Sequence, residues 1–480
     1  MELRNRKWSD EEFLEERQKV LAKWPTGKEI DLDEAIEYRK RLPNGKVWNN
    51  MISKQKDGKP LFMLSMGHAT VEETLEHMKF LEELGADVLI PFPDAYTRKS
   101  RYEEAQVGLE ESLKQGKNML NGYPIVNHGL KAARLIREII NIPIRCVVDC
   151  DEDPRLNAEM ALASGFDTGS QDLHDLMQHS KNYPLDKRIQ NNQYCSWLAG
   201  YYTRKGAPVE VQVPGNLCGW DPPGIKIALI IIQCLMTAEQ GVKHLHPVIS
   251  GTCNIVQDIA SIKVLRDIVK EYLYGYGYDD VCMPYPVDYQ GWQGSFPSDP
   301  HRASALVAWC TVIGTLGGAN HIWARSIQEA TGITSKESNA IGLRICQQVV
   351  NTLGRQRLPE TEELRLEQEM MRLEVRALVD RVIELGDGDV AVGQLKAVER
   401  GELDAAFSPW IYLKGKVLPV RDKNGAIRYQ DHGNLPLPKE VIRYHKEKIA
   451  ERESAEGNKA DLKMVISDIT CFSKDLYIKV

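Results

Sequence analysis

From Leu61 to about residue 335, short apolar runs alternate with longer stretches of helical periodicity. A short apolar run that is buried on both faces is typical of a strand in a parallel sheet. The amphipathic stretch that follows each run would supply the helix that crosses back over the sheet. This alternation constrains the fold more than any other feature, because it predicts repeated βα units and therefore an α/β protein.

Seven apolar runs are predicted strands, and two weaker runs bring the candidates to nine. The stronger candidates are residues 61–66, 88–92, 144–148, 209–213, 245–249, 281–284 and 322–324, and the weaker ones are residues 124–127 and 166–168. A barrel of eight strands needs one fewer, and we predict that 124–127 is a loop. Amphipathic helices are expected between the strands, for example over 70–84, 256–274 and 301–315.

The predicted fold class is α/β, a TIM (β/α)8 barrel with an N-terminal helical extension and a small α+β C-terminal domain. A doubly wound open sheet is the competing fold, but no GxGxxG phosphate motif follows the first strand, where the sequence reads LSMGHATVEE.

We expect an N-terminal extension over 1–55, a catalytic barrel over 56–355 and the C-terminal domain over 356–480. In the last, residues 362–384 predict a long charged helix. Asn424 and Gly425 lie between two apolar runs and predict a hairpin.

Composition excludes several classes of partner. Lys plus Arg number 61 against 68 Asp plus Glu, a formal net charge of −7, so neither nucleic acid nor an anionic membrane is an expected partner. No apolar run reaches the ~18 residues of a membrane span, and the charged first residues do not form a secretory signal. The 10 cysteines are scattered without a CxxC pair, which is typical of a reducing compartment. A cytoplasmic protein is expected.

Two groups of residues have a specific chemical interpretation, because active sites of barrels lie at the carboxyl ends of the strands. His244 and His246 are spaced as on one face of a strand and, with Asp149 or Asp151, would bind a divalent metal. Alternatively, His244 lies at the strand entrance and His246 is a hydrogen-bonded barrel residue.

The second group contains the arginines that follow two predicted strands. Arg98 follows the second strand and Arg325 follows the last, where a guanidinium would bind an anionic or hydroxylated ligand. The alternative is that both are ordinary solvated charges. The acidic stretch DCDEDPR at 149–155 is more typical of a loop and the start of a helix, with Pro154 in the first turn, than of a metal site.

Longer motifs resemble the catalytic (epsilon) subunits of glutamate mutase, also called methylaspartate mutase. The resemblance covers nearly the whole chain. It rests on MELRNRKWSDEEF and WPTGKEIDLDEA near the start, DAYTR at 94–98, MLNGYPIVNHG at 119–129, TAEQGVKH at 237–244, QDIA at 257–260, EYLYGYGYDDV at 271–281 and PVRD at 419–422.

The resemblance implies a cofactor and a partner. Members of that family are barrels that cap a separate small cobalamin-binding subunit and use adenosylcobalamin, whose cobalt–carbon bond breaks homolytically so that a substrate hydrogen is abstracted and a carbon fragment shifts to the neighbouring carbon. The cobalamin subunits carry a DxHxxG motif, whereas Asp431, His432 and Gly433 are adjacent here. A partner subunit is therefore implied, with this chain as a homodimer within a heterotetramer.

The cofactor positions of the family match this chain. Family members hold the adenosyl ribose with a Lys and a Glu four residues apart after the last strand, and Arg325 and Glu329 occupy those positions. Asn121, Phe296 and Ile333 match further positions that line the cofactor in the family. The resemblance therefore implies an intact cofactor end.

The substrate end differs. The family binds the two carboxylates of glutamate with three arginines, of which only Arg98 is plainly present; Met66, Gly67 and His68 stand at one of the other sites and 147–149 at the next. The family Glu that receives the substrate ammonium falls at 169–171, and two family tyrosines fall near 176 and 179. The predicted substrate-binding residues are His68, Arg98, Asp149, Ser170, Gln171 and His179.

These differences predict an altered substrate. Each lost charge-assisted pair would have contributed ~1.5 to 3 kcal/mol, enough to disfavour a dianion such as L-glutamate. We expect a mutase that acts on a small amino, keto or hydroxy acid and has no structural metal. A metal-dependent barrel lyase or aldolase built on His244, His246 and Asp149 is the second interpretation. A binding homologue that has lost catalysis is the third.

Overall fold

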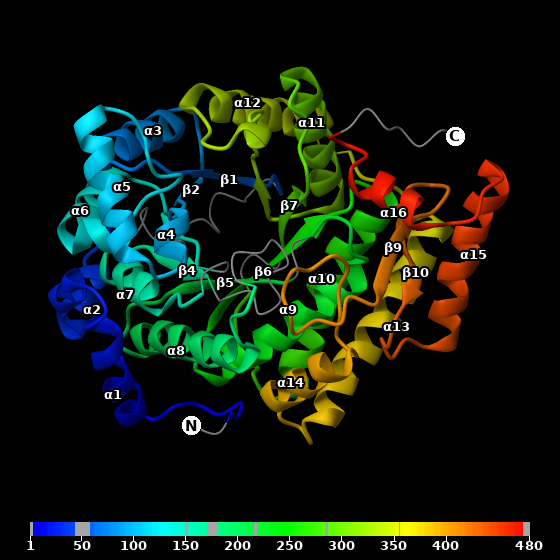
Figure 1. The fold of residues 1–480 in the computed structure, drawn as a ribbon, viewed down its shortest axis with the longest axis horizontal. Helices are drawn as coiled ribbons and strands as arrows, with labels where there is room; N and C mark the ends of the chain where they lie inside the picture. The colour runs from blue at the N-terminus through cyan, green and yellow to red at the C-terminus, as the bar shows by residue number, and fades with distance from the viewer. Residues whose placement is uncertain are drawn as a thin grey trace.

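A ring of eight parallel strands forms the centre of the molecule in this computed structural model (Figure 1). The structure describes residues 3–43, 58–148, 152–169, 181–215, 218–283, 287–354 and 356–473. Hydrogen-bonded neighbours follow the order β2-β1-β8-β7-β6-β5-β4-β3, and a parallel bridge between Leu89 and Ile144 joins β2 to β3. The sheet is therefore closed, and the predicted TIM barrel is confirmed.

The strands are short and mostly lie where the apolar runs predict them. They are β1 (Leu61–Met66), β2 (Val88–Pro91), β3 (Arg145–Cys146), β4 (Asp167–Gly169), β5 (Glu210–Pro214), β6 (His244–Gly251), β7 (Asp288–Trp292) and β8 (His321–Trp323). Residues 124–127 are not a strand, as predicted, but they open helix α6 instead of forming a loop.

The predicted strand at 281–284 is wrong. Within 281–283, Cys282 makes only an isolated bridge with His244, and the seventh strand begins at Asp288. The sequence DYQGW of β7 is not an apolar run, because Asp288 and Gln290 alternate with outward-facing Tyr289 and point into a polar barrel interior. The expected pattern of a strand buried among apolar side chains therefore fails there.

Helices surround the strands in the order expected of βα units. They are α3 (Val71–Glu83), α4 (Ala95–Arg98), α5 (Tyr102–Gln115), α6 (Ile125–Ile139), α7 (Arg155–Ala163), α8 (Leu185–Arg204), α9 (Pro223–Glu239), α10 (Ile255–Gly275), α11 (Pro300–Gly317), η4 (Glu329–Thr331) and α12 (Lys336–Leu353). The helices expected over 70–84, 256–274 and 301–315 are confirmed as α3, α10 and α11. Among the described residues, no helix combines the length and apolar character needed to cross a membrane.

The N-terminal helices α1 (Asp10–Leu21), η1 (Pro25–Glu29) and α2 (Leu32–Lys40) pack against the outer helices α6 and α7, and α2 also reaches the amino-terminal ends of β4 and β5. Arg39 of α2 donates from Nε to Pro208 O at 3.0 Å and from Nη1 to Phe166 O at 2.9 Å, and it forms an ion pair with Asp167 of β4. Phe13 of α1 stacks on Trp197 of α8 with ring centroids 3.8 Å apart. The extension is therefore part of the barrel's packing.

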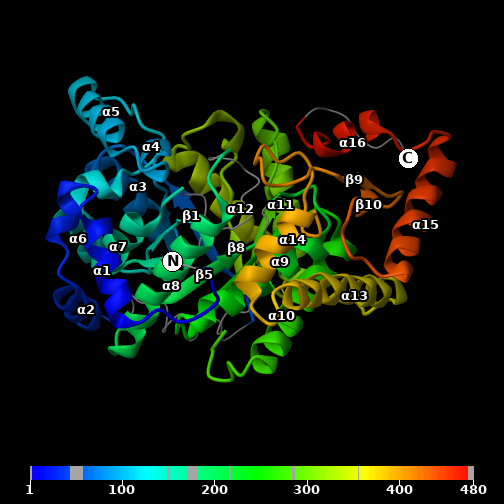
Figure 2. The same cartoon turned by 60° about the horizontal axis from the view of Figure 1, so that its bottom comes forward.

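The C-terminal elements cover one side of the barrel. They are α13 (Glu362–Leu385), α14 (Val390–Arg400), β9 (Val417–Arg421), β10 (Ile427–His432), α15 (Lys439–Glu456) and α16 (Leu462–Ile469). Helix α13 confirms the predicted long helix and lies against α9 and α10 (Figure 2). The hairpin, α15 and α16 lie at the end of the molecule opposite α5 and α6 (Figures 1 and 2).

The predicted hairpin is confirmed, with a longer turn than the tight Asn-Gly pair suggests. Strands β9 and β10 pair antiparallel, and Asp422 N donates to Ala426 O at 2.8 Å. Within this turn only Gly425 adopts a positive φ, 84°. The Asp422 carboxylate accepts from Asn424 N and Ala426 N and so stabilises the rest of the turn. The boundaries at 55 and 355 stay predictions.

Candidate active site at the barrel mouth

The loop after β2 brings together two of the predicted site residues. Asp94 caps α4 by accepting hydrogen bonds from Tyr96 N at 2.8 Å and Thr97 N at 3.1 Å. Asn121 Oδ1 accepts from Ala95 N at 2.9 Å and so holds the start of the same short helix. The helix presents Arg98, a buried side chain whose guanidinium lies 5.0 Å from the centroid of the Phe92 ring.

The loop after β8 brings together two more predicted site residues, Arg325 and Glu329. Arg325 lies over the Trp323 ring at 4.8 Å, and its Nη1 is 3.5 Å from Glu329 Oε2. Glu329 Oε1 accepts from Ser326 N at 3.3 Å, which fixes the acid on the loop. Arg325 Nε is buried and has no hydrogen-bond partner within the described part of the chain. The pair therefore presents a donor and an acceptor side by side.

Phe296 and Ile333 lie on loops at the same edge of the sheet. Phe296 follows β7 and is half-buried against the core, and Ile333 follows η4 with 40% of its surface exposed. The loop before Phe296 is held by Trp292, whose Nε1 donates to Ser295 O at 3.2 Å. The role of both residues as a lining for the cofactor stays a prediction.

His68 at the end of β1 lies against α3. Its Nε2 is 2.8 Å from His77 Nδ1 and its Nδ1 is 3.2 Å from Asn118 Nδ2. His77 Nε2 is in turn 3.2 Å from Asn339 Nδ2 on α12. Burial lowers the pKa of His68 and lowers the pKa of His77 to about 3, so both rings are neutral near pH 7. His68 is thus the half-buried end of a chain of rings and amides.

The other four predicted substrate residues, Asp149, Ser170, Gln171 and His179, lie outside the described residues. So does Asp151 of the metal-site alternative. The roles given to them above stay predictions.

The interior of the barrel is divided into an apolar half and a polar half. Barrel interiors are usually filled with branched apolar side chains. Here the apolar half contains Leu61, Met63, Val88, Ile90, Val147 and Trp323. The polar half, on β3 and β5 to β8, contains Arg145, Glu210, Gln212, His246, Asp288, Gln290 and His321.

The polar half forms a continuous network around His246. Arg145 Nη2 is 3.0 Å from Glu210 Oε2 and 3.0 Å from His246 Nδ1. His246 Nε2 is 2.9 Å from His321 Nδ1. Burial lowers the pKa of His246 and that of His321 well below the ordinary range, so both imidazoles are neutral. The second interpretation of His246, as a hydrogen-bonded barrel residue, matches these contacts.

The histidine pair predicted from HxH spacing does not converge with a third ligand in the described part of the chain. His246 is fully buried in the network, whereas His244 is half-buried at the first position of β6. No group of three or more His, Cys, Asp or Glu side chains suited to a metal ion occurs among the described residues.

Sequence reasoning missed Asp288 as a residue of the barrel interior. Its Oδ2 accepts from Gln212 Nε2 at 2.8 Å, and its Oδ1 has no hydrogen-bond partner among the described residues. Burial raises the pKa of this carboxyl to about 7. The signal in the sequence is the spacing of Asp288 and Gln290 around Tyr289, two polar residues on one face of a short strand.

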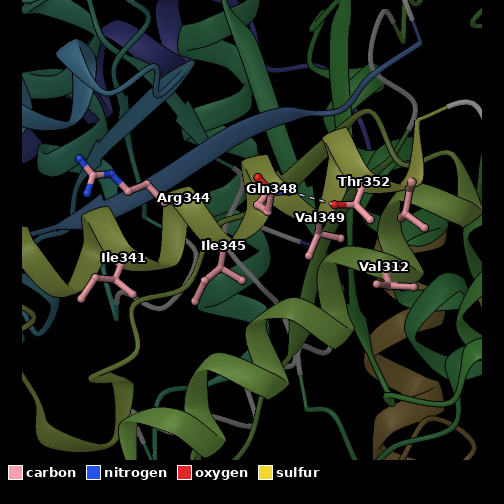
Figure 3. Close-up of a pocket in the computed structure, with 8 residues that line it drawn as sticks. Val312, Ile341, Arg344, Ile345, Gln348, Val349 and Thr352 are labelled. Carbon is pink, nitrogen blue, oxygen red and sulfur yellow. Dashed lines mark hydrogen bonds between the residues drawn. The ribbon is translucent and has the colours of Figure 1, made fainter.

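A groove of about 460 Å³ lies between α11 and α12, in the outer helix layer. Figure 3 shows Ile341, Ile345 and Val349 projecting from α12 beside Val312 of α11. Its lining is almost wholly apolar and includes none of the predicted site residues. It is therefore separate from the barrel mouth.

The closed parallel barrel, with its site residues on the loops after β2 and β8, defines a (β/α)8-barrel protein with a candidate active site at the carboxyl ends of the strands. The family described as Methylaspartate mutase E chain (MutE) matches residues 42–479. The chain belongs to this family. It is therefore a mutase subunit, and mutases are isomerases.

Relatives match over the full length of the chain. The glutamate mutase epsilon subunit of Desulfitobacterium hafniense (strain Y51) is 38% identical, with 100% of this chain and 99% of that protein covered. Those of Escherichia coli O157:H7 and Yersinia enterocolitica serotype O:8 are 37% and 38% identical, each with 98% of both chains covered.

Proposed function

We propose that this chain is the catalytic subunit of an adenosylcobalamin-dependent carbon-skeleton mutase. It works with a separate small cobalamin-binding subunit and acts on a small amino, keto or hydroxy acid other than L-glutamate. The observation that carries the proposal is the Arg325–Glu329 pair after β8, in which the buried Arg325 Nε has no hydrogen-bond partner among the described residues.

The residues after β8 fit the hydroxylated sugar of an adenosyl group. A sugar hydroxyl both donates and accepts hydrogen bonds, and Glu329 and Arg325 supply the matching acceptor and donor 3.5 Å apart. Asn121, Phe296 and Ile333 would line the remainder of the cofactor. When bound, adenosylcobalamin supplies the radical chemistry that allows a carbon fragment to move to the neighbouring carbon.

The chain's own residues would orient the substrate and exclude water. Arg98, held by its stack on Phe92, would bind one acid group of the substrate. The side chains of the apolar half are buried inside the barrel, and the substrate would enter from the side of the loops. A dry, fixed arrangement of this kind suppresses side reactions of a radical and holds the reacting atoms close together.

The contacts of Arg145 support a changed substrate. It is the arginine on β3, near one of the family's arginine sites, but it is held by Glu210 at 3.0 Å and by His246 at 3.0 Å in the polar half. An arginine already paired in this way does not serve a second substrate carboxylate. Residues 66–68 and 147–149 stand where the resemblance implies guanidinium groups.

The partner is proposed from the absence of a cobalt-ligating motif in this chain. The adjacent Asp431, His432 and Gly433 lack the DxHxxG spacing. A small DxHxxG subunit would carry the cobalamin, and two catalytic subunits would pair at the centre of a heterotetramer.

The proposal is tested anaerobically with the chain mixed with its cobalamin-binding partner and adenosylcobalamin. L-Glutamate and then related amino, keto and hydroxy acids are added, and cob(II)alamin is followed by absorbance and electron paramagnetic resonance. We expect a signal with a compound other than L-glutamate. A signal with L-glutamate together with 3-methylaspartate by mass would contradict the altered substrate. If no compound gives a cob(II)alamin signal and the purified protein holds a tightly bound divalent metal, the barrel lyase is favoured.

A variant pair tests the site after β8 in the same complex. Glu329→Gln removes the negative charge beside Arg325 and replaces one carboxylate oxygen with an NH2 donor. We expect affinity for adenosylcobalamin to fall about tenfold, as for one lost charge-assisted hydrogen bond. Glu337→Gln, an exposed acid in the first turn of α12, is the matched control. Equal cofactor affinity of both variants would remove Glu329 from the cofactor site.

A further inference from the structure

Trp292, the last residue of β7, is packed between segments that are distant in the sequence. Its side chain is fully buried, and its Nε1 donates to Ser295 O at 3.2 Å in the loop that carries Phe296. Gly219, in the loop after β5, and Gly294 both lie against the indole, where a Cβ at either position would come within 2.5 Å of a ring carbon. The loops on both sides are therefore fitted closely to this ring.

The C-terminal segment contacts the same indole. Phe472, which follows α16, meets Trp292 edge to face, with ring centroids 4.8 Å apart and an interplanar angle of 74°. The guanidinium of Arg421, at the end of β9, lies 5.8 Å from the centroid of Trp292 and 5.3 Å from that of Phe472. Edge-to-face rings attract each other, and so do a guanidinium and an aromatic ring. The hairpin and the segment after α16 thus reach the barrel at this indole.

Arg421 is itself fixed to the loop after β6. Its Nη2 donates to Thr252 O at 3.0 Å, and its Nη1 donates to Gly425 O at 2.6 Å in the hairpin turn. Its backbone N donates at 2.7 Å to Asp468 Oδ2 of α16, an oxygen that also accepts from Arg452 Nη1 at 2.7 Å. The barrel, the hairpin and α16 together therefore set the position of the guanidinium beside Trp292.

Two hydrogen bonds tie the loop after β7 to its surroundings. Gly219 N donates to Gln293 O at 2.9 Å, which joins the loops after β5 and β7. Ser295 O accepts from the Trp292 indole, and Phe296 is the next residue in the chain. Because a displacement of the indole would release Ser295 O, it would also change the position of Phe296.

We propose that Trp292 and Phe472 are positioning residues for the cofactor. The C-terminal segment holds the indole, and the indole holds the loop after β7 in the place where Phe296 lines adenosylcobalamin. This inference rests on the proposed function and goes beyond it, since it gives the C-terminal domain a part in cofactor binding. Without the ring of Phe472, the indole loses a packing partner and the loop opens more readily.

The test has two readouts. Hydrogen–deuterium exchange of the full chain, followed by mass spectrometry, reports the opening of residues 293–299 without any cofactor. Calorimetry of the complex with the cobalamin-binding subunit reports the affinity for adenosylcobalamin. The variants are Phe472→Ala, Phe472→Tyr and Trp292→Phe, the last of which keeps an aromatic ring and removes the donor to Ser295 O. Ile466→Ala, at an exposed position of α16, is the matched control.

We expect faster exchange over 293–299 in Phe472→Ala and in Trp292→Phe. Both variants should bind adenosylcobalamin about three- to tenfold more weakly, as for one lost aromatic contact or hydrogen bond. Phe472→Tyr keeps the ring and should restore both properties, and Ile466→Ala should match wild type. Trp292→Phe provides the answer if Phe472→Ala folds poorly, and Phe472→Ala does so in the reverse case.

Wild-type exchange and wild-type affinity in the folded variants would overturn the inference. Faster exchange with unchanged affinity would also overturn it, because the loop would then have no part in cofactor binding. So would an equal loss of affinity in Phe472→Tyr or Ile466→Ala, which would show a general effect on the C-terminal domain. In each case, adenosylcobalamin binding by the wild-type complex leaves the proposed function standing. Absence of that binding would instead contradict the proposed function itself.

Discussion

At the scale of single residues, the two candidate ligand-binding arginines share one arrangement. Arg98 lies over Phe92 at 5.0 Å and Arg325 lies over Trp323 at 4.8 Å. An aromatic ring under a guanidinium fixes the plane of the guanidinium and therefore the directions of its N–H groups. A lysine at either position would keep the charge and lose the planar fork.

Arg98→Lys tests this reasoning. We expect kcat/KM for the substrate to fall by about 10- to 150-fold, because a charge-assisted pair contributes ~1.5 to 3 kcal/mol. Steady-state kinetics with the reconstituted complex provides the measurement. Arg101→Lys is the matched control, since Arg101 lies exposed between α4 and α5 and is paired with Glu104 of α5. Unchanged kcat/KM in Arg98→Lys would exclude Arg98 from substrate binding.

The His68–His77 pair predicts a dependence of stability on pH. Burial lowers the pKa of His77 to about 3 from 6.5, so the unfolded chain binds a proton that the native chain does not. The contribution of the buried, neutral His77 ring to the free energy of unfolding is therefore complete above pH 6.5. It is lost as the pH falls from 6.5 towards 3, because protons then stabilise the unfolded chain.

The measurement is the melting temperature across that range for wild type and His77→Gln. We expect the variant to lose several degrees less than wild type as the pH falls. His301→Gln, at an exposed position of α11, should follow wild type. Parallel curves for wild type and His77→Gln would show that His77 does not titrate in this way.

At the scale of elements, one side chain of helix α2 holds the helix to the amino-terminal ends of β4 and β5. Arg39 satisfies the carbonyls of Pro208 and Phe166 and compensates the buried Asp167 carboxylate. Removing one partner of a buried pair leaves an uncompensated charge, which is the costly case.

Arg39→Ala should therefore destabilise the protein by about 3 to 5 kcal/mol. Thermal and urea unfolding, followed by circular dichroism, measure the change. Arg41→Ala, at the exposed end of the same helix, should change stability by less than about 0.5 kcal/mol. A small effect of Arg39→Ala would show that α2 is held mainly by apolar packing.

At the scale of the whole molecule, the C-terminal elements cover an apolar side of the barrel. Helix α13 buries Met371, Val375 and Leu378 and lies against α9 and α10. Gly224 of α9 allows this approach, because a Cβ there would collide with the Glu374 carboxylate, which also accepts from Tyr429 Oη at 2.6 Å. The barrel helices on this side are thus shaped to receive α13.

A truncated chain of residues 1–355 tests whether the barrel folds alone. We expect it to aggregate or to bind a hydrophobic dye, because the sides of α9 and α10 beneath α13 would face water. Sedimentation velocity of the truncated and full-length chains provides the measurement. A monodisperse, fully folded 1–355 chain would show that the predicted boundary at 355 separates independent units.

The sequence by itself determined the barrel and the loops that carry Arg98, Arg325 and Glu329. Apolar runs and helical periodicity are local properties, and the carboxyl ends of parallel strands meet at one edge whatever their partners are. The tertiary structure alone decided what lies inside the barrel. Strand β7 escaped prediction because Asp288 faces Gln212 and a polar interior built from distant strands. The pairing of Arg145 with Glu210 and His246 likewise depends on which inward positions meet, and no local pattern in the sequence records it.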